Sequence, residues 1–440
     1  MPETMQAGGT PHLYIGSSDM ADQKNVLEGL PVRITDSCPM VEPKPTGGVW
    51  TYRVAEPFYT KQGMENVQDA LAEGMISSAA GWAGKLSEAL MKYYQVPVAF
   101  PTCNGMTALM VALCAARIGP GDQVLVPSVT MVAVSNAVIF CGGVPVFCDN
   151  EKGGLNPGVA EYKAKATPKT KCLITCHTYG VGADIVGIAE LCKTNGWILI
   201  EDICEAIGTK VGGQLVGTFG DMACASMYAN KLITAGDGGF IIARDARLHD
   251  RLKSLLNHGF DPKYHFMHFE HAPNAKINGL GAALAAASVA EIDNLTAHRT
   301  KVAGWYRQGL AAVADKVTCM PPGEHDAPWV FGIELPDRKM RDALREHFAA
   351  HDIETRNYFF PLHLQPSSYL CGSRSYDIVL PVAEDQARTS FYLPTHAYLE
   401  QSDVEYICAV GRKFFNPDEA VPACPRVAGW TKDARASTLK

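Results

Sequence analysis

Two carboxylates and one amine stand where a parallel α/β protein places its reactive groups. Glu201 and Asp202 follow the apolar run Trp197–Ile200, which we expect to form a buried strand, and Lys231 precedes the glycine-rich segment Ala235–Gly239. Ligands of parallel sheets bind beyond the carboxyl ends of the strands, so these side chains are candidates for one site. Taken singly, each has an ordinary alternative: an acidic residue after a strand is often a turn former, and a lysine is usually a solvated surface group.

A third segment has the composition of a phosphate-binding helix start. Residues Thr102–Leu109 lead from a loop into a helix that we expect to continue to about Arg117. Free amides at a helix start, with a glycine and a threonine hydroxyl, suit an anion, although an ordinary capped helix is the alternative for this segment alone. A phosphate cradle, an aspartate at a strand end and a lysine on a later loop are, in this order, what pyridoxal 5′-phosphate requires. The aspartate keeps the pyridine nitrogen protonated, and the lysine forms an imine and then transfers protons.

The elements that position these residues alternate between strand and helix from about residue 60 to residue 292. This alternation is typical of an open, mainly parallel sheet with helices on both faces. We expect strands at 124–126, 144–147, 173–175, 197–200, 222–227, 240–243 and 329–334, and helices at 130–141, 184–195 and 279–295. The expected fold class is therefore α/β, with a large domain containing a mainly parallel mixed sheet over residues 49–297. A smaller C-terminal α+β domain and tail follow over residues 298–440, and the irregular residues 1–48 form an N-terminal extension or arm.

Composition and charge exclude several classes of protein. The net charge of -7 leaves no basic surface for nucleic acid. The start of the chain, Met1–Thr10, lacks a basic segment followed by an apolar run, so we expect no signal peptide. The uncharged stretch Val124–Cys148 is interrupted by prolines and glycines, which favours a buried strand–helix–strand unit over a membrane span.

The 14 cysteines are scattered singly and do not form a disulfide-like framework. Cys172, Cys176 and His177 lie close together, but a zinc site needs further ligands that this spacing does not supply. We therefore expect no metal site, and we interpret the cysteines as buried thiols of a protein in the reducing cytoplasm.

Short motifs occur in a characteristic order between about Gly74 and Phe415. They are Gly74–Ser78, Cys103–Gly105, Val126–Thr130, Glu201–Gly208, Gly217–Asp221, Ser226–Gly239, Tyr358–His363 and Leu380–Glu384. The set resembles the sugar aminotransferases of the DegT/DnrJ/EryC/StrS type, which include perosamine synthases and aminocyclitol aminotransferases. The resemblance implies a fold-type I pyridoxal-phosphate transferase that moves an amino group from glutamate or glutamine to a keto-sugar. It implies a nucleotide-linked acceptor of the 4-keto-6-deoxy type, with a keto-cyclitol as the alternative.

The resemblance also assigns catalytic roles to single residues. Lys231 matches the lysine that holds the cofactor as a Schiff base, and Asp202 matches the partner of the pyridine nitrogen. Glu205 matches a position, often glutamine, that approaches the ring hydroxyl. Asn274 matches an asparagine that reaches the phosphate of the partner subunit, which implies a homodimer with shared active sites. The alternative for Asn274 is a cap of the helix that follows it.

Five further residues are expected at the cofactor. Ser226 and the amides of Gly105 and Met106 match the phosphate cradle, and Thr107 is expected to supply the hydroxyl that a threonine at position 106 commonly gives. Met131 stands where an aromatic residue usually stacks on the ring, and methionine covers a ring face less rigidly.

The substrate side of the expected site is less closely matched. Ser78, Lys276, Arg356 and His363 are expected to border the substrate. Arginine is usual at position 276, and a lysine there offers a point charge in place of a planar fork. The lysine at position 276 does not affect the predicted transamination. It changes a residue expected at the substrate, so the resemblance does not specify the acceptor.

Three rival functions are weighed against this interpretation. A dehydratase of the same family would have histidine at position 231, which is lysine here. A nicotinamide dehydrogenase would continue Gly180–Gly182 with a glycine at position 185, which is isoleucine. A non-catalytic regulator that binds the cofactor on the same fold remains open, although it would not need Lys231, Asp202 and Glu205 together.

Overall fold

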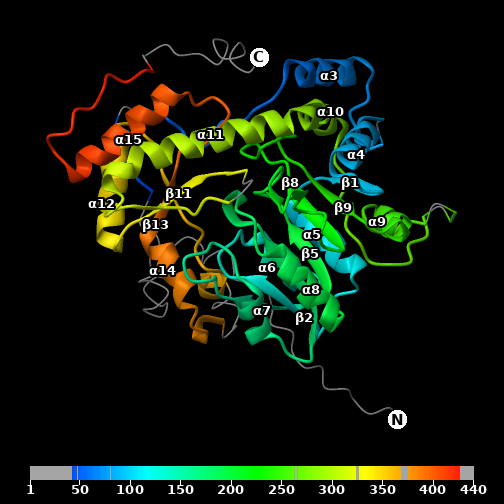
Figure 1. Ribbon diagram of the computed structural model, residues 1–440. Coiled ribbons are helices and arrows are strands. Elements are labelled where there is room, and N and C mark those ends of the chain that lie inside the picture. Colours follow the sequence, from blue (N-terminus) through cyan, green and yellow to red (C-terminus); the bar gives the residue numbers. More distant parts are fainter. Residues whose placement is uncertain are drawn as a thin grey trace, which may run out of the picture.

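The computed structural model describes residues 42–46, 48–79, 81–261, 263–264, 266–323, 327–367 and 375–426. Most of the expected N-terminal extension, residues 1–48, lies outside this range. The described chain forms a large unit around a long sheet and a smaller unit with a sheet of its own (Figure 1). The predicted α/β architecture is therefore confirmed.

A seven-stranded sheet is the centre of the large unit. Its strands lie in the order β1 (Val98–Thr102), β9 (Gly239–Ala243), β8 (Met222–Ser226), β5 (Ile198–Asp202), β4 (Thr170–Cys176), β2 (Gln123–Pro127) and β3 (Val144–Cys148). The run from β8 to β3 is parallel, whereas β9 pairs antiparallel with both β1 and β8. The strands are apolar on both sides because helices cover both faces of the sheet.

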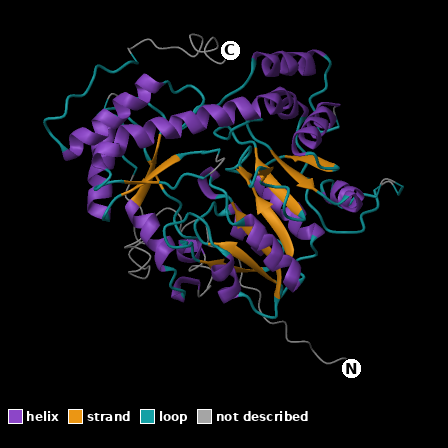
Figure 2. Ribbon diagram, viewed as in Figure 1, coloured by secondary structure: helices purple, strands orange, loops and turns teal. Residues whose placement is uncertain are grey.

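The covering helices form two layers, seen in purple on either side of the orange strands (Figure 2). One layer contains α5 (Gly105–Ala115), α6 (Ala133–Phe140) and α9 (His249–Leu255). The other contains α4 (Gly81–Tyr94), α7 (Val159–Lys165), α8 (Ile185–Asn195) and α10 (Gly279–Ser288), and α3 (Lys61–Ala72) packs on α10. Within the described residues, no helix has both the length and the apolar character needed to cross a membrane.

The smaller unit has a four-stranded antiparallel sheet. Its order is β10 (Thr318–Cys319), β11 (Phe331–Glu334), β13 (Ser390–Leu393) and β12 (Arg356–Asn357). Around it lie α11 (Ile292–Leu310), α12 (Arg338–Ala349), α14 (Pro381–Thr389) and α15 (Gln401–Phe415). Tyr306 of α11 stacks on Phe331 with 4.9 Å between the ring centroids, which places α11 against this sheet.

The elements differ from the prediction at several places, and the prediction contained no strand at β1. The helix expected over 279–295 is divided, because α10 ends at Ser288 and a 3-10 turn, Val289–Glu291, leads into α11. The expected boundary between residues 297 and 298 thus falls inside α11, and Tyr52 pairs with Ile353 in the core of the smaller unit. In addition, β5 includes both acidic residues and ends at Asp202, two residues beyond the predicted strand.

Gly239 is the tightest point between the sheet and the start of α5. A Cβ atom at this position would lie 2.6 Å from the carbonyl oxygen of Ala225 and 2.6 Å from the carbonyl carbon of Asn104. Both atoms belong to the backbone, so neither can move aside cheaply. We predict that Gly239→Ala lowers the free energy of unfolding by about 1–3 kcal/mol, measured by urea denaturation.

Gly84→Ala is the matched control for this change. Gly84 lies within α4, and an added Cβ would meet no heavy atom within 4 Å. Alanine is the better helix former by about 1 kcal/mol, so this variant should be as stable as the wild type or more so. Equal urea midpoints for Gly239→Ala and the wild type would contradict the packing argument.

Candidate active site

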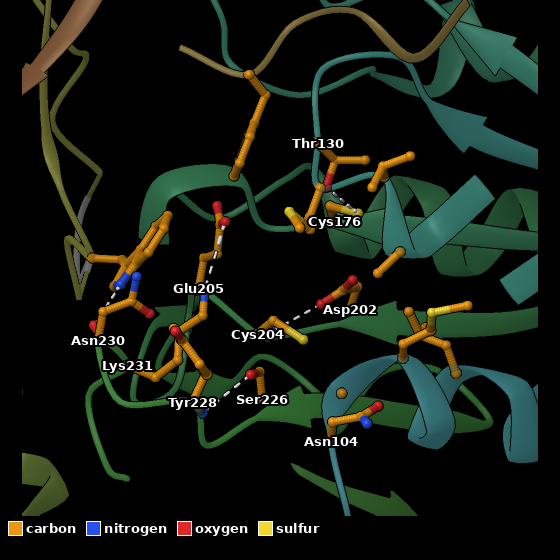
Figure 3. Close-up of a pocket in the computed structure, with 18 of the residues that line it drawn as sticks. Asn104, Thr130, Cys176, Asp202, Cys204, Glu205, Ser226, Tyr228, Asn230 and Lys231 are labelled. Carbon is orange, nitrogen blue, oxygen red and sulfur yellow. Dashed lines mark hydrogen bonds and ion pairs between the residues drawn. The ribbon is translucent and has the colours of Figure 1, made fainter. Parts of the chain in front are cut away.

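A cavity of 530 Å³ opens at the carboxyl ends of the central parallel strands. Its lining comes from the start of α5, the end of β5, the start of α6 and the loop that carries Lys231. The smaller unit contributes Trp329, Phe359 and Tyr392. Figure 3 shows Asp202, Glu205 and Lys231 around this space.

Asp202 reaches the cavity because it is the last residue of β5. Alternate residues of a strand share a face, so Asp202 lies on the same side as Ile200, which packs toward α5. Its Oδ1 accepts a hydrogen bond from the backbone N–H of Cys204 at 2.9 Å. Burial raises the pKa of the Asp202 carboxyl, and the hydrogen bonds from Cys204 and the charge of Lys231 oppose this effect. A protonated ring nitrogen is the kind of partner that would keep such a carboxyl charged.

Glu201 does not enter the cavity, although it is the neighbour of Asp202. It lies on the opposite face of β5, and its side chain is fully buried. Its Oε1 accepts hydrogen bonds from the N–H groups of Phe219 and Gly220 at 2.8 and 2.6 Å, and its Oε2 accepts from Gly217 at 2.7 Å. His177 Nε2 lies 3.2 Å from Oε2. Glu201 therefore stabilises the loop before β8, and Asp202 is the residue of this pair that faces the cavity.

Lys231 and Glu205 face each other across one side of the cavity. Lys231 Nζ lies 3.7 Å from Glu205 Oε1, and Glu205 Oε2 accepts the N–H of Tyr179 at 2.8 Å. Burial raises the pKa of the Glu205 carboxyl to about 7, although Lys231 opposes the shift. This carboxyl can therefore hold or release a proton near neutral pH beside the amine.

The start of α5 forms a capping box, which gives Thr107 a different role from the expected one. Asn104 caps the helix, its Oδ1 accepting the N–H of Thr107 at 2.9 Å, while the Thr107 hydroxyl lies 3.3 Å from the N–H of Asn104. Gly105, Met106 and Ser226 line the cavity together with Asn104, whereas Thr107 does not. The hydroxyl expected at the cofactor thus belongs to the capping box.

Met131 lies at the mouth of the cavity. It lines the cavity and is 51% exposed. The three residues of the cysteine and histidine motif do not form one cluster: Cys172 packs in the core, whereas Cys176 and His177 line the cavity and His177 also contacts Glu201. No group of three or more potential ligands for a metal exists in the part of the chain that the structure describes.

Four expected substrate contacts lie outside the cavity lining of this chain. Ser78 belongs to a turn after α3, and Lys276 pairs through its backbone with Thr102. Arg356, on β12, makes an ion pair of 2.8 Å with Glu354.

His363 is the fourth of these residues, and it is fully buried. Its Nδ1 lies 2.7 Å from Ser128 Oγ, and its Nε2 lies 3.3 Å from Glu384 Oε1. The imidazole therefore joins the loop after β2 to the start of α14 and links the two units. The sequence had instead predicted a position beside the substrate.

Asn274 is exposed and also lies outside the cavity lining of its own chain. It pairs with Asn257 through the backbone. Asn278, not Asn274, caps α10, since its side chain accepts the N–H of Gly281 at 2.8 Å. The capping alternative for Asn274 is therefore wrong, and its side chain is available for a contact outside this chain.

Sequence reasoning missed the aromatic wall that the smaller unit supplies. Trp329, Phe359 and Tyr392 lie far from Lys231 along the chain, and no local spacing connects them with it. It also missed Cys204 and Tyr228, although their neighbourhood to Asp202 and Ser226 within the motifs is a signal for both. The complete arrangement brings the amine of Lys231 and the buried carboxylates of Asp202 and Glu205 to one cavity, at the carboxyl ends of the parallel strands and beside the start of α5.

Comparison with known proteins names the family of this site. The chain matches the DegT/DnrJ/EryC1/StrS aminotransferase family over residues 58–410. It is 33% identical over 361 residues to GDP-perosamine synthase of Caulobacter vibrioides, which covers 81% of this chain and 96% of that protein. It is 35% identical over 312 residues to UDP-N-acetyl-3-dehydro-alpha-D-glucosamine 3-aminotransferase of Acidithiobacillus ferrooxidans, covering 70% of this chain and 82% of the relative.

Solved structures agree with these sequence matches. The aminotransferase TlmJ from Streptoalloteichus hindustanus superposes with a TM-score of 0.77 at 27% identity, covering 83% of this chain and 98% of the other. The chain belongs to the DegT/DnrJ/EryC1/StrS aminotransferase family. The family resemblance inferred from the motifs is thereby confirmed.

Glu205 generates a prediction about stability and pH. The folded state holds the proton of this carboxyl up to a pKa of about 7, whereas the ordinary value is 4.5. Folding is therefore increasingly disfavoured as the pH rises from about 4.5 to 7. We predict that Glu205→Gln is more stable than the wild type above pH 7, by up to about 3 kcal/mol, and that the difference disappears below about pH 4.5.

The measurement is urea denaturation of the cofactor-free protein at several pH values. Glu190→Gln is the matched control, because the Glu190 side chain is 70% exposed and its change should have no effect beyond about 0.5 kcal/mol. A Glu205→Gln variant that is less stable than the wild type at pH 8 would show that the ion pair with Lys231 outweighs the cost of burial.

Proposed function

We propose that this protein is a pyridoxal-phosphate-dependent aminotransferase that moves an amino group from glutamate or glutamine to a nucleotide-linked keto-sugar. The single observation that carries the proposal is that Lys231 and Asp202 face one cavity in a member of an aminotransferase family. The residues present fit the cofactor: Gly105, Met106 and Ser226 suit its phosphate, Asp202 its ring nitrogen and Lys231 its aldehyde carbon.

The side chains divide the work of the transfer. When bound, pyridoxal phosphate supplies an electron sink for the carbon that loses or gains a proton. Asp202 keeps the ring nitrogen protonated by its negative charge, which is buried and oriented by Cys204. Lys231 would bind the cofactor covalently, and its free amine would carry the proton. Glu205 lies beside this amine and is placed to contact the ring hydroxyl.

The acceptor is proposed from the relatives, whose names specify a perosamine synthase and a 3-aminotransferase of a UDP-linked keto-sugar. We favour a nucleotide-linked 4-keto-6-deoxy sugar and keep a keto-cyclitol as the alternative. The test follows 2-oxoglutarate release while glutamate and each candidate acceptor are supplied. Amination of a cyclitol but of no nucleotide sugar would reverse this preference.

The absorbance of the bound cofactor after addition of glutamate distinguishes an enzyme from a regulator that only binds the cofactor. Glutamate should convert the bound cofactor and remove its absorbance band near the visible range, whereas a regulator would keep the band.

We also place the protein in the cytoplasm. This location is supported by the cysteines of the described residues, all of which are free thiols.

The roles of Lys231 and Asp202 are tested by substitution. Lys231→Ala should abolish transfer because, among the described residues, no second lysine lines the cavity. Asp202→Asn should lower kcat by about 100-fold or more and leave the fold intact, because the ring nitrogen loses its negative partner. Lys193→Ala and Asp250→Asn are matched controls at exposed positions and should keep full activity. Normal turnover of Lys231→Ala would sink the assignment.

We further propose that the active site is shared between two copies of the chain. Apolar side chains are exposed on and after α3 and in the segment that precedes Asn274, which indicates a protein interface. They are Met64, Leu71, Met75, Ile76, Tyr264, Phe266, Met267 and Phe269. A symmetric dimer through these surfaces is the arrangement in which the exposed Asn274 of one chain would reach the phosphate beside Lys231 of the other.

Complementation tests the shared site. Lys231→Ala and Asn274→Asp should each be inactive, the second because its carboxylate repels the phosphate. Equal mixing should make half of the dimers mixed, each with one intact site, so about a quarter of wild-type activity should return. Differently tagged chains show whether mixed dimers form. Mixed dimers without activity, or full activity of Asn274→Asp alone, would contradict a role for Asn274 across the interface.

A further inference from the structure

The amine of Lys231 lies over the face of an indole ring from the smaller unit. Nζ is 3.6 Å from the centroid of the Trp329 ring, well within the range of a cation–π interaction. The Lys231 side chain is only 11% exposed, so water screens this attraction weakly. With Glu205 Oε1 at 3.7 Å, the ammonium group is held between a carboxylate of the large unit and an aromatic face of the smaller unit.

Trp329 is held rigidly enough to impose a position on the lysine. Its Nε1–H donates to the carbonyl oxygen of Asn230 at 2.9 Å, and its backbone N–H donates to Tyr179 O at 3.0 Å. Its carbonyl oxygen accepts from Arg299 Nη1 at 2.8 Å. The indole is also stacked near the rings of Tyr179 and Phe359, at interplanar angles of 21° and 15°. Because Asn230 directly precedes Lys231, the same indole fixes both the backbone and the amine of the catalytic loop.

We propose that Trp329 is a positioning residue for Lys231, whose indole face directs the amine into the cavity and favours its charged form. The inference rests on the proposed function, since it concerns the amine that would hold the cofactor. A ring face attracts an ammonium group but offers much less to the uncharged amine. The proposal therefore concerns both the direction of the amine and the attraction between its charged form and the ring face.

Other groups facing this amine also influence its charge. The carboxylates of Glu205 and Asp202 come from β5 and the turn after it, and Asp237 comes from the glycine-rich loop. Tyr228 and Tyr392 complete the polar lining on this side. Replacing the indole also removes its hydrogen bond to Asn230 and its contact with the Tyr392 ring, so the non-aromatic variants are compared with a variant that keeps a ring face.

The test measures how fast the cofactor-free protein captures added pyridoxal phosphate, by the absorbance of the bound cofactor, as a function of pH. Trp329→Met keeps an apolar side chain but removes the ring face. The midpoint of the rate profile should fall by about 0.4–1.5 pH units, because the uncharged amine then forms at lower pH. The limiting rate at high pH should also fall, because the amine is no longer directed into the cavity.

Trp329→Phe is the conservative variant, since it keeps a ring face but loses the second ring of the indole and the hydrogen bond to Asn230. Its midpoint should move less than half as far as that of Trp329→Met. Trp329→Leu is the second non-aromatic variant, for use if the methionine variant does not fold. Its midpoint and limiting rate should fall as predicted for Trp329→Met. A midpoint for the folded non-aromatic variant equal to that of the wild type would overturn the proposal.

Trp82→Leu is the matched control that the chain itself provides. The Trp82 ring carries Lys85 Nζ at 3.7 Å from its centroid, and the two indoles are equally buried, each 7% exposed. This control removes the same kind of pair away from the cavity and should leave the capture profile unchanged. An equal shift in Trp82→Leu would overturn the proposal by showing a general effect of lost packing. A wild-type protein that captures no pyridoxal phosphate would overturn the proposed function and this inference with it.

Discussion

The alternation of side chains along β5 is the constraint on which the whole cavity depends. Adjacent residues of a strand point to opposite faces, so Glu201 and Asp202 are separated by the sheet although they are neighbours in sequence. Glu201 supplies the acceptors for three backbone N–H groups of the loop 217–220, which would otherwise be buried without partners. Asp202 is left free to face the ligand. A slip of one residue in register would exchange the two and lose both functions.

The division into two units places the reactive groups in one and much of their surroundings in the other. Lys231 and Asp202 belong to the large unit, whereas the indole of Trp329 comes from the smaller one. The interface between the units is polar as well as aromatic, since His363 contacts Ser128 and the carboxylate of Asp149 accepts N–H groups at the start of α14. These charged and polar contacts give the smaller unit one defined orientation over the cavity.

Local patterns predicted six of the seven strands of the large sheet, all except β1, and singled out Asp202 and Lys231, which line one cavity. Buried parallel strands are short apolar runs, and a carboxylate directly after such a run, such as Asp202, has few places to lie except the sheet edge. The remaining features depend on packing between distant segments. No pattern around Trp329 tells which side chain its ring will face, and the motif around His363 does not reveal that the imidazole is buried. The hydroxyl of Thr107 could contact a phosphate or the N-terminus of its own helix. In the structure it belongs to the capping box at the start of α5.

The helix α11 has a mechanical consequence for the way in which ligands enter. Its first turns, with Ile292 and Leu295, are buried in the core of the large unit, while Val302 and Tyr306 are buried in the core of the smaller unit. One continuous helix thus belongs to both cores. A hinge motion between the units would have to bend α11 or remove one of its ends from the core in which it packs. Because α11 packs in both cores, we expect the cavity walls to be ordered before a ligand binds. The entropy of ordering them is lost during folding, so binding does not have to supply it.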